Sequence, residues 1–398
     1  MSAPDGDQPR PAASARPAGA GSSGAGAGSP PPPSLAELIA RRRIIVCCGS
    51  GGVGKTTLAA VVALEGARTG RRTVVVTIDP AKRLADALGL AGLTDTPSRI
   101  DGDWPGQLWA TMLDTKSTFD ALVMKHASSP AQGERILANG FYRNISGALS
   151  GTQEYMAMEK LYELHEETDF ELVVVDTPPT RHALDFLDAP RRLSRFLEHR
   201  LFRLLIAPSR GLVKAVNVAA QTFLRTVSKV VGSDVVEDAI AFFQAFEGME
   251  EGFRQRAARV NELLTAPETA FVLVASPRRD TVEEAHFFAD RLRQGGISVE
   301  GLVVNRVHPS FGPAPDVSVA LAAGAAKRAE TLAGTPIGGY YRNLADFQAV
   351  ASRERAHLSG LSEAVAPAPV VWVPFLSSDV HDIDGMAEVA AHVFSRPK

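Results

Sequence analysis

The sequence predicts an α/β protein built on a doubly wound, mostly parallel sheet. Apolar, β-branched runs recur along the chain, and stretches with helical patterning separate them. Several of these runs are apolar throughout and do not alternate with polar residues, which is typical of parallel strands covered by helices on both faces. The expected strands are 44–48, 73–78, 108–112, 171–176, 270–276, 301–305 and 370–374.

The first expected strand leads into a glycine-rich loop and then a helix-forming stretch. The loop has the spacing Gly49-x-x-x-x-Gly54-Lys55-Thr56, which is that of a phosphate-binding loop. Its glycines let successive backbone N–H groups curl around anionic oxygens, and the following helix adds its unpaired N-terminal amides. Lys55 can reach the β- and γ-phosphates of a nucleotide, and the Thr56 hydroxyl can bind Mg²⁺.

This loop predicts that the protein binds a nucleotide together with Mg²⁺. We expect Lys55 to act in catalysis and Thr56 to act as a metal ligand. The nucleotide-binding residues expected here are Gly49, Ser50, Gly51, Gly52, Val53, Gly54, Lys55, Thr56 and Thr57.

Two further expected strands end in aspartate, Asp79 and Asp176. The carboxyl ends of strands face the ligand crevice in doubly wound folds, so both carboxylates are expected near the bound phosphates. Phosphoryl transfer to water needs a carboxylate on the metal side and a group that orients the water. Asp176 suits the first task, directly or through water, and Asp79 suits the second. Asp79-Pro80 also fits a helix N-cap followed by proline, so a structural role for Asp79 stays open.

Composition limits the class of protein. The 398 residues are 45% hydrophobic and 22% charged, as in a globular protein with a substantial core, and the net charge of −3 favours neither nucleic acid nor anionic membrane. Cys47 and Cys48 are adjacent on an expected buried strand and leave no Cys-x-x-Cys motif for zinc. The sequence shows no transmembrane run and no signal-peptide pattern. We therefore expect a cytoplasmic protein.

The chain divides into a tail and one large domain. Residues 1–33 are dominated by Ala, Gly, Pro and Ser, and such a segment cannot bury enough apolar surface to offset the entropy of ordering. Residues 34–398 are expected to form the nucleotide-binding domain, which starts at a capping box. The helix-like stretches 113–168 and 187–268 exceed simple crossovers, so we expect them to form an inserted helical subdomain.

Five motifs in order resemble the arsenical-pump ATPases and the related ATPases that target tail-anchored proteins. They are the phosphate loop, Thr77 to Ala81, Gly151 to Glu154, Asp176 to Leu184, and Val303 to Arg306. The resemblance implies a P-loop NTPase of the deviant Walker A class that hydrolyses ATP and closes as a dimer. It implies that Asp79 orients water in the first switch and that Asp176 belongs to the second.

The resemblance also implies how the base is held. The family's asparagine that contacts adenine corresponds to Asn305, and the segment that closes over the base corresponds to Pro374 and the loop after it. We therefore expect Asn305 and Pro374 to bind the nucleotide.

The chain departs from the family pattern at Ser50. The family has a lysine at this position that reaches across the dimer to the partner's phosphates, and a serine cannot supply that charge. Either hydrolysis is slow, or a lysine-bearing paralogue completes the site, so the expected working unit is a heterodimer, with a homodimer as the other possibility. The helical stretches carry no cysteine, which argues against a thiolate site for arsenite, and the zinc clamp of the eukaryotic targeting dimers is missing.

The segment 199–233 combines basic residues with apolar residues at helical spacing and contains no acidic residue. Three interpretations stay open: subdomain core with a basic outer face, a groove for an apolar client helix, or a contact with anionic membrane.

Three function classes follow from these observations. The favoured one is an ATPase switch that acts on a protein client or a membrane transporter. The main alternative is a hydrolysis-poor, nucleotide-gated scaffold, which the serine at position 50 suggests. The least favoured class is a partitioning or cell-division ATPase. Such a protein would need a membrane or DNA contact, and the stretch 386–397 has little positive charge for one.

Overall fold

The computed structural model describes residues 33–79, 83–145, 152–178, 189, 195, 233–309, 311 and 315–394. Several predictions lie outside these residues. They concern the tail over 1–32, the basic segment up to 232, Gly151, the Pro80-Ala81 pair, and the part of the second switch from Pro179 to Leu184.

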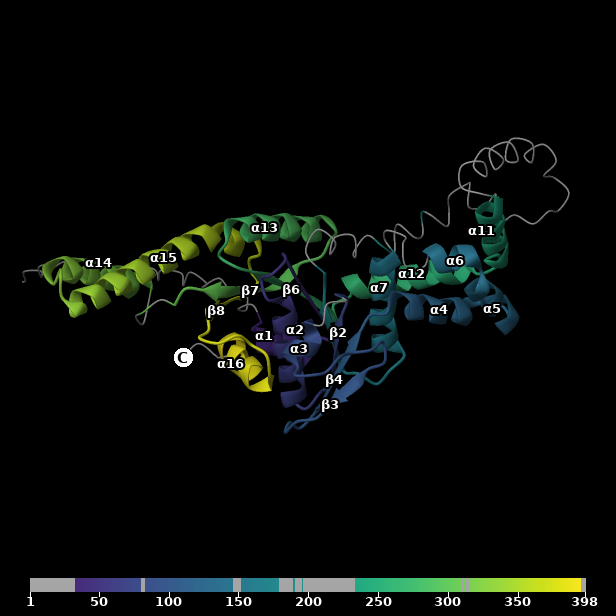
Figure 1. The fold of residues 1–398 in the computed structure, drawn as a ribbon, viewed down its shortest axis with the longest axis horizontal. Helices are drawn as coiled ribbons and strands as arrows, with labels where there is room; N and C mark the ends of the chain where they lie inside the picture. The colour runs from purple at the N-terminus through teal and green to yellow at the C-terminus, as the bar shows by residue number, and fades with distance from the viewer. Residues whose placement is uncertain are drawn as a thin grey trace, which may run out of the picture. The chain divides into compact units, whose positions relative to one another are not determined.

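Within residues 33–398 the strands form one eight-stranded sheet, with the order β3-β4-β2-β5-β1-β6-β7-β8. Helices flank this sheet (Figure 1). Neighbouring strands run parallel except at the edge, where β3 pairs antiparallel with β4. All seven expected strands are present, while β3 was not expected because it is short and polar. The strands are β1 (Ile44–Gly49), β2 (Arg72–Thr77), β3 (Ser98–Ile100), β4 (Gln107–Met112), β5 (Leu172–Asp176), β6 (Thr269–Ala275), β7 (Val299–Val307) and β8 (Val370–Pro374).

The central strands are buried on both faces, which explains their unbroken apolar sequences. On β1, the side chains of Ile44, Val46 and Cys48 enter one apolar cluster, and those of Ile45 and Cys47 enter another. This alternation is the two-residue period of a strand with a core on each side. Both cysteines are free and fully buried, as expected of core residues.

Helices cover both faces of the sheet, so the predicted doubly wound α/β fold is confirmed. The first cluster is covered by α7 (Thr152–Glu166), α12 (Glu250–Thr265) and α13 (Arg279–Gln294), and the second by α1 (Leu35–Arg41), α2 (Lys55–Arg68) and α16 (Ile383–Phe394). The expected capping box opens α1, since the Glu37 amide donates to Ser34 Oγ (3.3 Å) and the Ser34 amide donates to Glu37 Oε2 (2.8 Å).

Additional helices occupy the connections between β4 and β6. They are α4 (Thr115–His126), α5 (Pro130–Ala138), α6 (Gly140–Ile145) and α11 (Ser233–Ala245), next to α7 and α12. The two connections meet, because α11 contacts α5 and α6 while α12 contacts α7. Their apolar side chains join the cluster on one face of the sheet, and the assignment of 113–168 and 187–268 to a separate subdomain stays a prediction.

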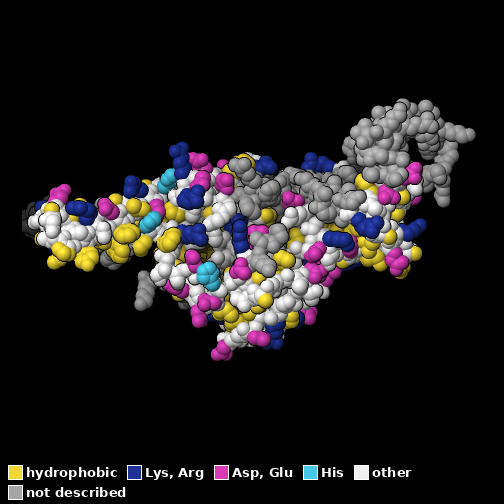
Figure 2. Space-filling view, in the orientation of Figure 1, with side chains coloured by type: hydrophobic (Ala, Val, Ile, Leu, Met, Phe, Trp, Pro, Cys, Tyr) yellow, Lys and Arg dark blue, Asp and Glu magenta, His cyan; other side chains and the backbone are white. Residues whose placement is uncertain are grey.

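A helical hairpin connects β7 to β8. Its helices α14 (Pro315–Thr331) and α15 (Pro336–Ala364) pack on each other, and α15 also contacts α13. Four large apolar side chains stay exposed on this hairpin: Leu321, Ile337, Tyr340 and Phe347. Figure 2 shows yellow atoms along one side of the hairpin. No helix among the described residues is both long and apolar enough to cross a membrane.

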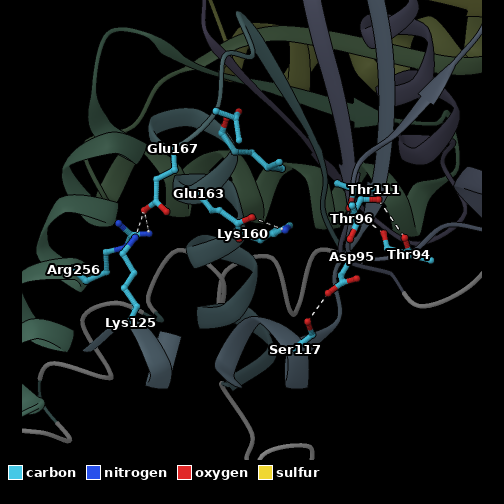
Figure 3. A network of polar contacts seen from close by, with 12 residues as sticks. Thr94, Asp95, Thr96, Thr111, Ser117, Lys125, Lys160, Glu163, Glu167 and Arg256 are labelled. Atoms are coloured by element: carbon cyan, nitrogen blue, oxygen red, sulfur yellow. Dashed lines mark hydrogen bonds and ion pairs between the residues drawn. The ribbon is translucent and has the colours of Figure 1, made fainter. Parts of the chain in front are cut away.

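A buried ion pair joins two of the helices that pack against the sheet. Arg256 of α12 forms a salt bridge with Glu159 of α7, and these side chains are 9% and 4% exposed. The guanidinium also contacts Glu167 (Nη2 to Oε1, 2.9 Å), and Glu167 in turn pairs with Lys125 of α4 (Figure 3). The Arg256 guanidinium carbon lies 3.7 Å from the ring centroid of Tyr162. Burial raises the pKa of Glu159, and Arg256 opposes this rise.

We predict that Arg256→Met lowers the free energy of unfolding at pH 7.5 by about 3 kcal/mol, because it leaves the Glu159 carboxylate buried without its cation. Urea denaturation measures this change. The matched control Arg254→Met removes an exposed pair with Glu251 and should change stability by less than about 1 kcal/mol. The double variant with Glu159→Gln should recover most of the loss, and an Arg256→Met variant as stable as the control would contradict this account.

Candidate nucleotide-binding site

The phosphate loop connects β1 to α2 at the carboxyl edge of the sheet. Gly52 and Gly54 have φ angles of 75° and 96°, which residues with a side chain rarely adopt. A Cβ at Gly54 would also lie 2.3 Å from Nδ2 of Asn305. The backbone therefore needs glycine at position 54 both for its conformation and for close packing. The nine residues from Gly49 to Thr57 form the end of β1, the loop and the first turn of α2.

Lys55 folds back across this loop. Its Nζ donates to the backbone carbonyl of Ser50 (2.8 Å), and the residue is 7% exposed. Burial lowers the pKa of Lys55, and the nearby Asp176 opposes the decrease. The ammonium thus lies inside the loop, where an anionic ligand would offset the cost of removing its charge from water. The Ser50 hydroxyl is also buried and has no hydrogen-bond partner among the described residues.

Asp176 lies at the end of β5, between the ends of β1 and β2. Its Oδ2 accepts hydrogen bonds from the hydroxyls of Thr56 (2.8 Å) and Thr77 (2.9 Å). Its Oδ1 is buried and has no hydrogen-bond partner within the part of the chain that the structure describes. A buried carboxylate oxygen without a partner is costly, and binding Mg²⁺ or its water would relieve that cost. The residues therefore fit a magnesium site at Oδ1.

Burial raises the pKa of Asp176 to about 6. The two threonine hydroxyls and Lys55 oppose this rise, since each favours the charged form. Thr77 is a site residue that the sequence analysis missed. Its signal was a hydroxyl at the end of β2, where Thr77 lies opposite Asp176 in the strand register.

Asp79 follows β2 at the same edge of the sheet. Its side chain is 23% exposed and forms an ion pair with Nη1 of Arg83 (3.3 Å), the first residue of α3 (Arg83–Ala87). The preceding residue, Ile78, is held from two sides, because its amide donates to the Asp176 carbonyl (3.2 Å) and its carbonyl accepts from Nε2 of Gln153 (3.3 Å). The structure thus brings Asp79 and Asp176 together. Gln153 is a second residue that the sequence analysis did not assign.

A cavity of about 360 Å³ opens beside the loop. Asn305 and Pro374, the two residues expected at the base, both line it, together with Gly54, Thr57, Arg306 and Phe375. Nδ2 of Asn305 donates to the carbonyl of Val53 (2.9 Å), so this side chain contacts the loop and the cavity at once. The cavity therefore adjoins the phosphate loop on the side away from Asp176.

The anion-transporting ATPase family model matches residues 42–313. The chain is 26% identical to the ATPase GET3 of Malassezia globosa over 264 residues, which cover 66% of this chain and 72% of that protein. It is 24% identical to the putative arsenical pump-driving ATPase 2 of Aquifex aeolicus over 282 residues, 67% of this chain and 81% of the relative. The ATPase asna-1 of Caenorhabditis elegans is 29% identical over 156 residues, 37% of this chain and 45% of that protein.

The matched span contains the phosphate loop, both carboxylates and Asn305. The resemblance found in the sequence is thereby confirmed, and so is the prediction that the chain is an enzyme that acts on ATP. The chain belongs to the anion-transporting ATPase family and is an ATPase.

Proposed function

We propose that this ATPase is a dimeric switch in which the state of the bound nucleotide controls the helices between β4 and β6. The observation that carries the proposal is the arrangement around Asp176. One oxygen of this buried carboxylate joins the phosphate loop to β2 through Thr56 and Thr77, and the other is left for a cation.

The proposed roles follow from the positions of the side chains. The amides of the loop and Lys55 hold the phosphates, and Thr56 and Asp176 hold Mg²⁺. Mg²⁺, when bound, offsets negative charge on the phosphate oxygens. Asp79 orients the attacking water from the exposed edge, while Asn305 and Pro374 contact the base.

The described contacts supply a route from the nucleotide to the helices. Gln153 lies in the first turn of α7 and holds the peptide that precedes Asp79. Two turns further along α7, Glu159 forms the buried ion pair with Arg256 of α12. A shift of the Ile78–Asp79 segment would therefore move α7, and α12 with it.

The proposed target of the switch is another protein, either an apolar client or a membrane transporter. The resemblance to targeting and pump ATPases supports this class of partner. The apolar side chains on the α14–α15 hairpin supply a further surface for protein contacts. We place the proposed switch in the cytoplasm.

We predict that Asp79→Asn spares ATP binding and reduces single-turnover hydrolysis by about 100-fold or more, because the amide cannot orient and accept a proton from water. Lys55→Ala should instead abolish ATP binding in calorimetry. The matched controls are Asp103→Asn and Lys327→Ala, two exposed positions away from the loop. Full turnover by the Asp79→Asn variant would show that another group orients the water.

We predict that Asp176→Asn stabilises the nucleotide-free protein at pH 7.5. The pKa of Asp176 is raised from 3.8 to about 6, so the folded state binds the proton more tightly than the unfolded state. Stability is thus lost as the pH rises through about 6, and the cost of the charged form at pH 7.5 is about 3 kcal/mol. The amide removes that cost and still accepts from both threonines.

Urea denaturation at pH 7.5 and pH 4.5, without nucleotide or magnesium, measures this effect. The advantage of Asp176→Asn should shrink at pH 4.5, where the wild-type carboxyl is largely protonated. The control Asp169→Asn lies on an exposed carboxylate and should show no such dependence. An Asp176→Asn variant less stable than wild type at pH 7.5 would contradict the assignment of a costly buried charge.

We predict that a lysine-bearing paralogue completes the nucleotide site of this chain. Co-purification from the native organism should recover a heterodimer, and single-turnover hydrolysis should be faster in that complex than in the isolated chain, because the partner's lysine offsets charge that Ser50 cannot. A self-dimer with ordinary turnover would refute the heterodimer. Slow hydrolysis in both preparations would favour the alternative function, a nucleotide-gated scaffold.

A further inference from the structure

A bulge interrupts β7 beside the phosphate loop. The register between β7 and β8 shifts between Val304 and Val307, so that Asn305 and Arg306 lie outside the regular ladder. Arg306 has a φ of 60°, a left-handed conformation that is unfavourable for a residue with a Cβ. Bulges next to active sites commonly re-aim side chains, and this one turns two neighbouring side chains onto the loop.

The two side chains bind successive carbonyls of the loop from outside. Nδ2 of Asn305 donates to the Val53 carbonyl (2.9 Å), and Nη1 of Arg306 donates to the Gly52 carbonyl (3.0 Å). The bulge is itself braced, because the Arg306 amide donates to Oδ1 of Asn305 (2.9 Å). The close approach of Asn305 needs the missing side chain at Gly54.

The direction of these carbonyls determines the direction of the neighbouring amides. In a trans peptide the C=O and N–H bonds point in opposite directions. Holding the carbonyls of Gly52 and Val53 toward β7 therefore turns the N–H groups of Val53 and Gly54 away from β7. A charged donor on the Gly52 carbonyl also polarises that peptide and makes its N–H a stronger donor.

We infer that Asn305 and Arg306 are positioning residues that aim the amides of the phosphate loop at the anionic ligand, with Arg306 supplying the polarising charge. The inference rests on the proposed role of the loop in binding phosphate. Donors fixed before the ligand arrives need no reorganisation when it binds. Asn305 keeps one N–H and one lone pair beyond these bonds, so it can hold the loop and still contact a base in the adjoining cavity.

Calorimetry on the full chain tests the inference with Mg·ATP, Mg·ADP, inorganic tripolyphosphate and adenosine. Arg306→Ala should weaken binding of the three phosphate ligands to a similar degree, about tenfold, since all of them use the same amides. Binding of adenosine should not change. Arg306→Lys should recover part of the affinity because it restores the charge without the planar guanidinium. The control is Arg342→Ala, on the exposed side of α15.

Three outcomes would overturn the inference. Unchanged affinity of Arg306→Ala for the phosphate ligands would show that the loop keeps its shape unaided. A loss confined to ATP would show direct contact between Arg306 and the γ-phosphate, and an equal loss for adenosine would show collapse of the cavity wall. If the wild-type chain bound none of the phosphate ligands, the proposed function would fail together with the inference, whereas binding by wild type and by Arg306→Ala alike would remove the inference alone.

Discussion

The buried carboxylate of Asp176 is the constraint on which the site depends. Parallel pairing places Asp176 opposite Cys47 on one neighbouring strand and opposite Thr77 on the other, so this residue lies between β1 and β2. Both threonine hydroxyls share a single carboxylate oxygen, which leaves the other buried and without a partner among the described residues. Folding alone would favour an uncharged group here, so the carboxylate carries a cost that a bound cation would offset.

Hydrogen bonds hold the phosphate loop and its surroundings on two flanks. On the β7 side, Asn305 and Arg306 bind the carbonyls of Val53 and Gly52. On the β2 side, the Thr56 and Thr77 hydroxyls share Oδ2 of Asp176. The Ile78 amide donates to the Asp176 carbonyl, and Nε2 of Gln153 donates to the Ile78 carbonyl. The two sides differ in which elements they join to the loop: the β7 side joins it to the bulge, and the β2 side joins it through Ile78 to α7.

The sequence predicted the strands well because continuous apolar runs have one simple explanation, burial on both faces. It also predicted that the loop and both carboxylates lie at the ends of strands, because each of them belongs to a short motif that directly follows an apolar run. The sequence did not predict the contacts of three further residues at the site. The contact of Thr77 depends on strand register, that of Gln153 on the start of α7, and that of Arg306 on a bulge. Apolar periodicity records which face a residue occupies but not which distant backbone group its side chain meets, so such contacts need the folded chain.

The charge balance of the site follows from the same contacts. Lys55 and Asp176 occupy the interior, where burial disfavours the charge of each, and each opposes the shift of the other. Arg83 pairs with Asp79 at the exposed edge, and Arg306 donates to the Gly52 carbonyl of the loop from the β7 side. Ser50 adds no charge at the position where the resemblance implies a lysine. A nucleotide with its magnesium ion would bring an anion to Lys55 and a cation to Asp176, so binding would offset the cost of burying these two charges.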